Sequence, residues 1–206
     1  MKLNDLILLF IPLLVTCQEA KDTEIWGPVP QEVYSISDSA PPTDAIILFD
    51  GSDLSKWKAK WSESETKWQI NNDGSVSVVN DGSGGIETIE NFGSVQLHIE
   101  WKTSEDTSHQ NQDRSNSGVF LQGIYEIQIL DSYKSSTYVN GQAGSVYKQY
   151  IPLVNSSRKP GEWQSYDIIF DAPKFNSDGK KNQIRVFYCI SQWCFNSQSC
   201  RNFRNN

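Results

Sequence analysis

The feature that most constrains the fold of this chain is a two-residue alternation of apolar and polar side chains. It runs through residues 95–101, 125–129 and 166–170, where every second residue is apolar. Such alternation is typical of strands that bury one face against a core. Asp-Gly or Asn-Gly pairs, which supply the positive φ that tight turns need, punctuate these runs. The pairs stand at 50–51, 73–74, 81–82, 140–141 and 178–179.

Many short strands joined by regular turns predict an all-β fold, a sandwich of two antiparallel sheets. Residues 68–70 and 76–78 flank the sequence Asn-Asn-Asp-Gly and predict one hairpin. No helical periodicity extends over more than two turns. The 206 residues include 7 Trp, 8 Tyr and 9 Phe, which is enough large apolar surface for a packed core.

The N-terminus predicts export. Residues 6–15 (LILLFIPLLV) are apolar throughout and too few to span a bilayer as a helix, as in a secretory signal. Cys17 follows this run, an arrangement that resembles the cleavage box of bacterial lipoproteins, in which the cysteine is lipidated. We predict a lipoprotein signal peptide over 1–16 and lipidation of Cys17, which would anchor the protein to the cell envelope on its periplasmic or outer surface. The alternative is an ordinary signal with an incidental cysteine.

Residues 17–45 are polar and carry four prolines, which predicts a tether or extended arm before the sandwich of 46–186. The net charge of −7 makes nucleic acid a poor partner, because such a surface repels phosphate groups. The two histidines, His98 and His109, lack zinc-site spacing, and the sequence holds no HExxH, CxxC, GxSxG or Walker phosphate-binding motif. These patterns argue against zinc peptidases, α/β-hydrolases and nucleotide-dependent enzymes.

Several long stretches resemble one known family. They are AIILFDGSDLSKW (45–57), FGSVQLHIEWK (92–102), NSGVFLQGIYEIQILDSY (116–133) and GQAGSVYKQYIPLVNSSRKPGEWQSYDIIFDAP (141–173). These motifs, in this order, are similar to those of the 3-keto-disaccharide hydrolase domain family. The arm segments EIWGPVPQEV (24–33) and APPTDAI (40–46) resemble a secreted branch of the same family. The resemblance covers residues 24–186, most of the chain.

The resemblance implies a concanavalin-like jelly-roll sandwich whose concave sheet faces a sugar. It also implies action on glycosides, such as 3-keto-disaccharides, that carry a ketone at carbon 3. That ketone acidifies the proton on carbon 2, so a base can remove it, the group on carbon 1 leaves, and water adds back. Such a site needs a base, a proton donor to the leaving oxygen, and donors or a cation near the enolate oxygen.

Three other readings stay open at this point. One is a non-catalytic carbohydrate-binding module, because jelly rolls host both binding proteins and enzymes. Another is an ordinary glycosidase with two carboxylates, roughly 5–5.5 Å apart for retention or roughly 6.5–9.5 Å apart for inversion. The last is an inactive truncated paralogue, which the C-terminal sequence suggests.

Glu126, Glu100 and Asp131 are the candidate catalytic residues. Glu100 and Glu126 each stand in mid-strand on the polar side of an alternation, which is either the sugar-binding surface or a solvated face. The motif match favours the sugar-binding surface, more for Glu126 than for Glu100. Asp131 ends its strand and suits a turn cap, an acid or base, or a metal ligand. The sequence requires no cofactor, although a divalent cation such as calcium would suit Glu126, Asp131 and carbonyl oxygens.

Seven further residues are candidate substrate contacts. They are Gln128, Asn116, Lys102, His98, Arg114, Tyr147 and Gln142. Gln128 shares the face of Glu126, and its amide both donates and accepts hydrogen bonds, as sugar hydroxyls require. Asn116 begins the preceding strand, where a sugar contact and a turn role are equally plausible. Tyr147 and Gln142 are candidate substrate contacts through the family resemblance alone.

The cationic candidates lie on two different segments. Lys102 and His98 share the face of Glu100, and many relatives in the family resembled carry arginine at the position of Lys102. Lysine keeps the positive charge but loses the planar fork of a guanidinium. His98 can titrate near neutral pH, although a lone histidine is more often structural. Arg114 is an alternative cation in the loop 104–115.

The sequence after residue 186, FYCISQWCFNSQSCRNFRNN, departs from the strand pattern. Its cysteines at 189, 194 and 200 suit a disulfide-bearing extension of an exported protein, but three cysteines leave one unpaired. Members of the family resembled end instead in a strand with an Asn-Gly-Val turn. Residues 192–197 can be encoded by codons that, read one nucleotide on, give Asn-Gly-Val-Leu-Ile.

We therefore predict an aberrant tail over 187–206, produced by a frameshift, and a sandwich that lacks its last strand. Each large buried side chain is worth roughly 1.5–3 kcal/mol against a total stability of roughly 5–15 kcal/mol. On this hypothesis the chain is poorly folded or inactive. Resequencing the corresponding DNA tests it, and an uninterrupted reading frame with no family-like alternative would refute it.

Overall fold

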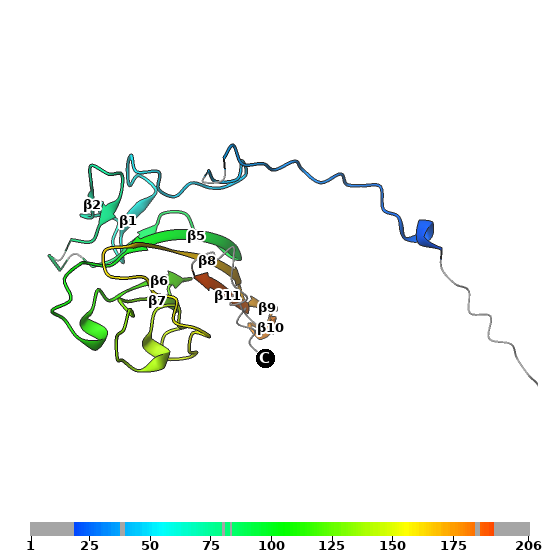
Figure 1. The fold of residues 1–206 in the computed structure, drawn as a ribbon. Coiled ribbons are helices and arrows are strands. Elements are labelled where there is room, and N and C mark those ends of the chain that lie inside the picture. The colour runs from blue at the N-terminus through cyan, green and yellow to red at the C-terminus, as the bar shows by residue number, and fades with distance from the viewer. Residues whose placement is uncertain (1–18, 38–39, 80, 83, 184–185, 192–206) are drawn as a thin grey trace, which may run out of the picture. The chain divides into compact units, whose positions relative to one another are not determined.

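The computed structural model describes residues 19–37, 40–79, 81–82, 84–183 and 186–191 (Figure 1). They fall into two compact units that divide after residue 87. Within these residues the helices are three short 3-10 turns, η1 (Ala20–Thr23), η2 (Asn111–Asp113) and η3 (Val139–Gly141). The strands are β1 (Trp57–Ala59), β2 (Gln69–Ile70), β3 (Val76–Ser77), β4 (Ile86–Thr88), β5 (Val95–Lys102), β6 (Ser117–Leu121), β7 (Tyr125–Ile129), β8 (Trp163–Asp171), β9 (Lys174–Phe175), β10 (Lys181–Gln183) and β11 (Val186–Ser191).

Some of the sequence-based predictions lie outside the described residues. These are the signal peptide of 1–16, the lipidation of Cys17, and the part of the tail from 192 to 206, which includes Cys194 and Cys200. They stay predictions. Across the described part of the chain, no helix is long and apolar enough to cross a membrane.

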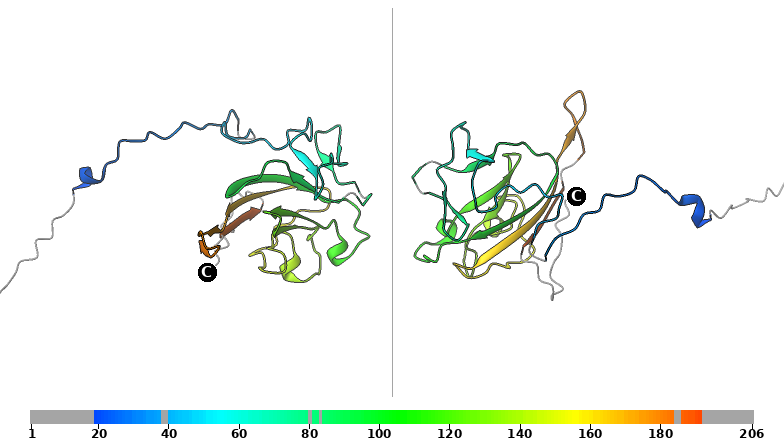
Figure 2. Two further views of the ribbon diagram at one scale, coloured as in Figure 1. Left: turned by 180° about the vertical axis from the view of Figure 1, so that it is seen from behind. Right: turned by 90° about the horizontal axis from the view of Figure 1, so that it is seen from above.

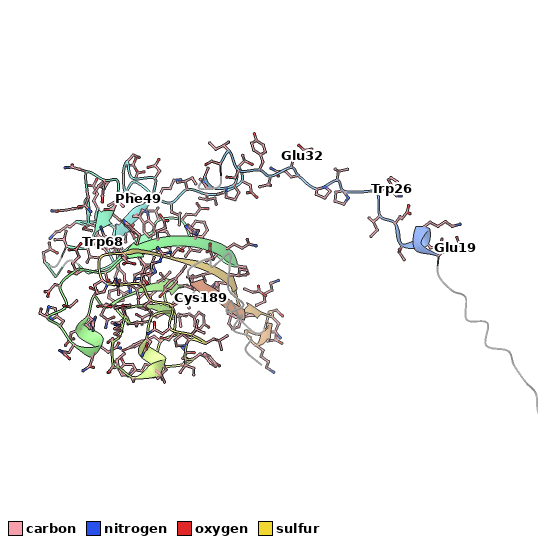
Figure 3. All side chains as sticks on the ribbon, in the orientation of Figure 1. Glu19, Trp26, Glu32, Phe49, Trp68 and Cys189 are labelled. Carbon is pink, nitrogen blue, oxygen red and sulfur yellow. The ribbon has the colours of Figure 1, made fainter. Side chains whose placement is uncertain are left out.

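The first unit contains the predicted hairpin. β2 and β3 pair antiparallel, with Gln69 opposite Ser77. The turn between them uses Gly74 at a φ of +78°, a conformation that favours glycine. β1 pairs with β4 in a second two-stranded sheet. Upstream of these strands, residues 24–37 form neither helix nor strand, and Trp26 is 87% exposed (Figure 3).

The second unit consists of two antiparallel layers (Figures 1 and 2). The first layer has the strand order β11-β8-β5, and β5 pairs with β8 from Val95 opposite Phe170 to Lys102 opposite Trp163. The second layer is the pair β6–β7, and β9 and β10 form a separate hairpin. The three alternating runs of the sequence are therefore β5, β7 and β8, and the prediction of an all-β antiparallel fold is confirmed.

The hydrophobic core lies between the two layers. β5 contributes Trp101, β8 contributes Tyr166 and Phe170, and Ile127 faces them from β7. The rings of Trp101 and Tyr166 are 5.3 Å apart between centroids. The Tyr166 hydroxyl donates a hydrogen bond of 2.7 Å to the backbone carbonyl of Gln128, which ties the layers together. Each layer therefore has one face in the core and one face opposite it.

β11 extends the first layer past the predicted end of the sandwich. It pairs antiparallel with β8, from Val186 opposite Asp171 to Ser191 opposite Tyr166. The boundary that we expected at 186/187 therefore lies inside a strand. Backbone pairing with β8 requires no strict alternation of side chains, and a buried cysteine behaves as a small apolar residue.

Cys189 of β11 is a free, buried thiol rather than part of a disulfide (Figure 3). Burial raises the pKa of this thiol to about 12, and the nearby carboxylate of Asp167 acts in the same direction. Because the thiolate is the reactive form, Cys189 is an inert core residue near neutral pH.

The Asn140-Gly141 pair is not the tight turn that we expected. It lies in η3, and Gly141 has no positive φ. A Cβ atom on Gly141 would lie 2.0 Å from Cε2 of Tyr138, so the glycine leaves space for that ring. The prediction was wrong because a glycine can be required for its small size as well as for its backbone freedom. Here Gly141 is required for its small size, since the Tyr138 ring packs against it.

Candidate active site

The face of β7 that points away from the core carries two of the candidate residues. Ile127 lies in the core, so Glu126 and Gln128 lie on the opposite face. The segment after η3 runs along β7, with Val146 bridged to Ile127. The amide of Tyr147 donates to the carbonyl of Glu126 at 3.0 Å. Tyr147 therefore lies directly across from Glu126, where side chains of neighbouring strands meet.

Glu126 lies over a glycine of the neighbouring strand. A Cβ atom on Gly118 of β6 would lie 2.3 Å from the Oε1 atom of Glu126 and 2.7 Å from its Cγ atom. Gly118 pairs with Gln128 in the β6–β7 register. The missing side chain therefore leaves the space that the Glu126 carboxylate occupies, and it fixes the direction in which that carboxylate points.

Gln128 is fully buried, which the alternation did not predict. Its amide Nε2 donates to Oδ1 of Asn116 at 3.0 Å. Its backbone N–H donates to the carbonyl of Ser145 at 3.0 Å. Among the described residues, Oε1 of Gln128 and Oγ of Ser145 are buried without a hydrogen-bond partner. Gln128 holds Asn116 in place, and Asn116 is the exposed member of the pair.

Asp131 and Arg114 form an ion pair between the loops that flank the β6–β7 pair. The carboxylate is 2% exposed and the guanidinium side chain 16%. Arg114 donates from both Nε, at 2.9 Å, and Nη2 to Oδ2 of Asp131. The other oxygen, Oδ1, accepts the amide of Tyr133 at 3.1 Å. With both oxygens engaged, Asp131 joins the loop before β6 to the loop after β7, and the structure favours the turn role over the acid or base role.

A second tyrosine that the sequence did not single out adjoins Tyr147. The hydroxyl oxygens of Tyr138 and Tyr147 lie 2.6 Å apart. The ammonium group of Lys148 lies 3.8 Å from the centroid of the Tyr138 ring. Gln142, a predicted contact, caps the C-terminal end of η3 in the same segment. The one sequence signal that points to Tyr138 is Gly141, three residues later. The role of this glycine is clear only in the structure, where the Tyr138 ring occupies the space of a side chain.

Glu100, His98 and Lys102 lie elsewhere. Their exposed face of β5 is opposite the core residue Trp101, and β5 belongs to the other layer. His98 Nδ1 lies 2.8 Å from Oδ1 of Asp167, and Lys102 Nζ lies 5.0 Å from the centroid of the Trp163 ring. The core therefore separates the Glu100 face from the Glu126 face. The two glutamates, which share a polar strand pattern, do not share a site.

The geometry does not suit the calcium ion that we considered. In the part of the chain that the structure describes, no group of three or more His, Cys, Asp or Glu side chains could hold a metal ion. Asp131, the expected second ligand beside Glu126, already binds the cationic side chain of Arg114. A guanidinium in that position leaves no anionic pair for a hard cation.

Comparison with known proteins relates this chain to one family and one fold. The family model of the 3-keto-alpha-glucoside-1,2-lyase-like domain matches residues 44–198, beyond the expected tail boundary. A crystal structure from Parabacteroides distasonis ATCC 8503, provisionally assigned as a glycosyl hydrolase, is 39% identical, with a TM-score of 0.77 over 90% of this chain and 86% of that chain. A second structure with the same source and assignment is 20% identical over 73% of each chain, with a TM-score of 0.47.

None of the curated proteins compared with the chain matches it. The family match covers more than half of the chain, and the 39% identical structure has the same fold over most of its length. The predicted jelly-roll β-sandwich is thereby confirmed. The chain belongs to the 3-keto-alpha-glucoside-1,2-lyase-like domain family, which is the family that its sequence motifs resemble.

Proposed function

We propose that this protein cleaves glycosides oxidised to a ketone at carbon 3, and that it does so on the outer face of the β6–β7 layer. The family match supports a carbohydrate substrate, and the P. distasonis structure supports hydrolase-type activity. The proposed reaction is proton abstraction from carbon 2, loss of the group on carbon 1, and addition of water to the resulting enone. Glu126 is the general base in this scheme.

The observation that carries this proposal is the separation of the candidate carboxylates. A conventional glycosidase needs two carboxyl groups roughly 5–9.5 Å apart on either side of one bond. Here Glu100 lies beyond the core, and Asp131 is bound by Arg114 at 2% exposure. Glu126 remains as the one predicted carboxylate on the polar face of β7. Elimination next to a ketone needs a single base, because the ketone itself supplies the acidity at carbon 2.

Two neutral residues near Glu126 suit a sugar. Asn116 presents an exposed amide that Gln128 holds in place, and Tyr147, which carries a hydroxyl group, lies across from Glu126. Amides and hydroxyls offer both donors and acceptors to sugar hydroxyls. The enolate oxygen that forms on carbon 3 would accept hydrogen bonds from such donors, which lowers the barrier to proton removal.

The substrate requirement tests this proposal directly. The protein should release free sugar from a 3-keto-disaccharide and leave the unoxidised disaccharide intact. Cleavage of the unoxidised disaccharide at a similar rate would mean a conventional glycosidase. Binding of either sugar without cleavage would mean a carbohydrate-binding module or an inactive paralogue, and the proposal would then be abandoned.

Gly118→Ala should lower turnover while it leaves the fold intact. The added methyl group would overlap Oε1 of Glu126, so the carboxylate must move, and a displacement of about 1 Å at a reacting group costs about 10²-fold in rate. Gly93→Ala is the matched control, because its Cβ atom would meet nothing within 4 Å. Steady-state kinetics and thermal melting of both variants check this. Equal activity of the two variants would show that the position of Glu126 does not matter.

A further inference from the structure

We propose that Tyr147 donates the proton to the leaving oxygen, and that Tyr138 donates a hydrogen bond to Tyr147 as it does so. The inference rests on the proposed function, because it assigns the acid of that reaction. Its first support is the hydroxyl pair itself, with 2.6 Å between the two oxygens. Such a short contact lets one phenol stabilise negative charge that develops on the other.

Tyr147 lies at the correct place for an acid that works with Glu126. The two residues are direct neighbours across the pair of antiparallel segments, joined by the Tyr147 amide and the Glu126 carbonyl. In the substrate, the proton that the base removes is on carbon 2, and the oxygen that leaves is on the adjacent carbon 1. A base and an acid on neighbouring positions of one face can reach two such adjacent atoms.

The surroundings of Tyr138 hold its ring beside Tyr147. The absence of a side chain at Gly141 makes room for one edge of the ring, at Cδ2, Cε2 and Cζ. The Lys148 ammonium lies 3.8 Å from the centroid of the Tyr138 ring and 5.6 Å from that of Tyr147. A cation at this distance favours the phenolate that forms when Tyr147 loses its proton. The backbone of Lys148 is fixed in turn by a 2.8 Å hydrogen bond from its amide to the Asn140 carbonyl.

An open hollow next to Tyr138 provides space for the leaving group. It is lined by Asn111, Gln112, Ser136, Thr137 and Tyr138, all polar and uncharged. Gln112 donates from Nε2 to Thr137 and to the Gly141 carbonyl, while its Oε1 atom is buried without a partner among the described residues. Neutral polar side chains of this kind suit the hydroxyl groups of a sugar. A leaving sugar in the hollow would keep its glycosidic oxygen near the tyrosine pair.

The protonation state of Tyr147 suits an acid. In the resting site the hydrogen bond with Tyr138 raises the pKa of Tyr147 above the usual value near 10, which is the direction expected when Tyr147 is the donor; desolvation and the Glu126 charge act in the same direction, and Lys148 opposes them. The Tyr138 hydroxyl becomes the donor when the Tyr147 proton turns to the leaving oxygen. A raised pKa means that the phenol keeps its proton throughout the neutral range and loses it only as the pH rises past that value. The loss of this proton should therefore lower the rate on the alkaline side.

The proposed step balances within the site. The Glu126 carboxylate takes the proton from carbon 2, and the electrons of that C–H bond form the double bond between carbons 1 and 2. The electron pair of the C1–O bond stays on the leaving oxygen, which takes the Tyr147 proton. When water adds, its oxygen bonds to carbon 1, one water proton restores Tyr147, and Glu126 returns a proton to carbon 2. The sum is hydrolysis.

Two substrates with different leaving groups test this inference. Tyr147→Phe should lower kcat/KM by roughly 10²–10³-fold on a methyl 3-ketoglucoside, whose leaving group needs a proton. On the 4-nitrophenyl 3-ketoglucoside of the same anomer, whose leaving group is a stable anion, the loss should be less than about tenfold. Tyr138→Phe and Gly141→Ala should show the same selectivity with a smaller loss, about tenfold on the methyl substrate, because the acid remains but loses its hydrogen bond.

Tyr150→Phe is the matched control, because Tyr150 lies in the same segment as Tyr147 and is 42% exposed, and it should behave as the unmodified protein with both substrates. Equal losses on the two substrates, or no loss on the methyl glycoside, would overturn the acid role of Tyr147. If Tyr147→Phe does not fold, the selectivity of Tyr138→Phe decides the question. A failure of the unmodified protein to cleave either 3-ketoglucoside would instead refute the proposed function, so the two failures are distinguishable.

Discussion

Glu126→Gln should abolish turnover of a 3-keto-disaccharide, with a loss in kcat of at least about 10³-fold. The amide has nearly the shape of the carboxylate, so it still fits over Gly118, but it cannot accept the proton from carbon 2. Substrate binding should change little, because the neighbouring amides and hydroxyls remain. Steady-state kinetics combined with calorimetric binding of the keto sugar separates the two effects.

Glu100→Gln is the informative comparison for this variant. The residue has the same type and the same polar strand position as Glu126, but it lies on the β5 face beyond the core. Its replacement should change kcat by less than about twofold. A loss in Glu100→Gln as large as that in Glu126→Gln would contradict the placement of the site on the β6–β7 layer.

Asp131→Asn should destabilise the fold by about 3 kcal/mol or more. The variant leaves the Arg114 guanidinium, itself 16% exposed, without its anionic partner, and breaking a buried pair from one side typically costs about 3–5 kcal/mol. For a chain of this length a loss of that size lowers the melting temperature by roughly 6–12 °C. Urea denaturation followed by intrinsic fluorescence measures the change in the free energy of unfolding.

Asp106→Asn is the control for this prediction, because Asp106 belongs to an exposed pair with His109. Exposed substitutions usually stay within about 0.5 kcal/mol. The double variant Arg114→Met with Asp131→Leu should recover part of the stability, since it leaves no buried charge. An Asp131→Asn protein that melts normally but loses turnover would mean that Asp131 acts chemically after all.

The periodicity of the sequence predicted the strands because strand alternation is a local property. β5, β7 and β8 follow directly from residues whose apolar side chains recur at every second position. The same periodicity assigns each side chain to one of two faces. It carries no information on which sheet a strand joins, so Glu100 and Glu126 looked equivalent although they lie in different layers.

The features of the site that the sequence did not predict depend on contacts between distant segments. Asp131 and Arg114 are 17 residues apart, and the ion pair forms only because the loops on either side of the β6–β7 pair converge. The sequence predicts an exposed polar residue at Gln128, but the residue is fully buried, and its backbone binds the distant Ser145. In the sequence Tyr138 is an ordinary aromatic residue of a loop, and only the fold brings it against Gly141 and Tyr147.

The C-terminal sequence lacks alternation, which predicted that the sheet ends at residue 186, and the structure differs. Residues 186–191 lack alternation, but their backbone pairs with β8 residue by residue. Cys189 serves there as a buried apolar side chain. The family match likewise continues to residue 198. The frameshift hypothesis now concerns the sequence from 192 onward, and resequencing that part of the gene still tests it.

Incorporation of deuterium tests the central claim most directly. The protein would be incubated in heavy water with a 3-keto-disaccharide, and the products would be followed by NMR. Water enters the site between elimination and hydration, so the proton held by Glu126 exchanges with the solvent before it returns. The released 3-keto sugar should therefore carry deuterium at carbon 2 from the first turnover. The free 3-keto product, incubated alone, gives the background exchange. Products that carry no more deuterium at carbon 2 than this background would contradict elimination and hydration at Glu126.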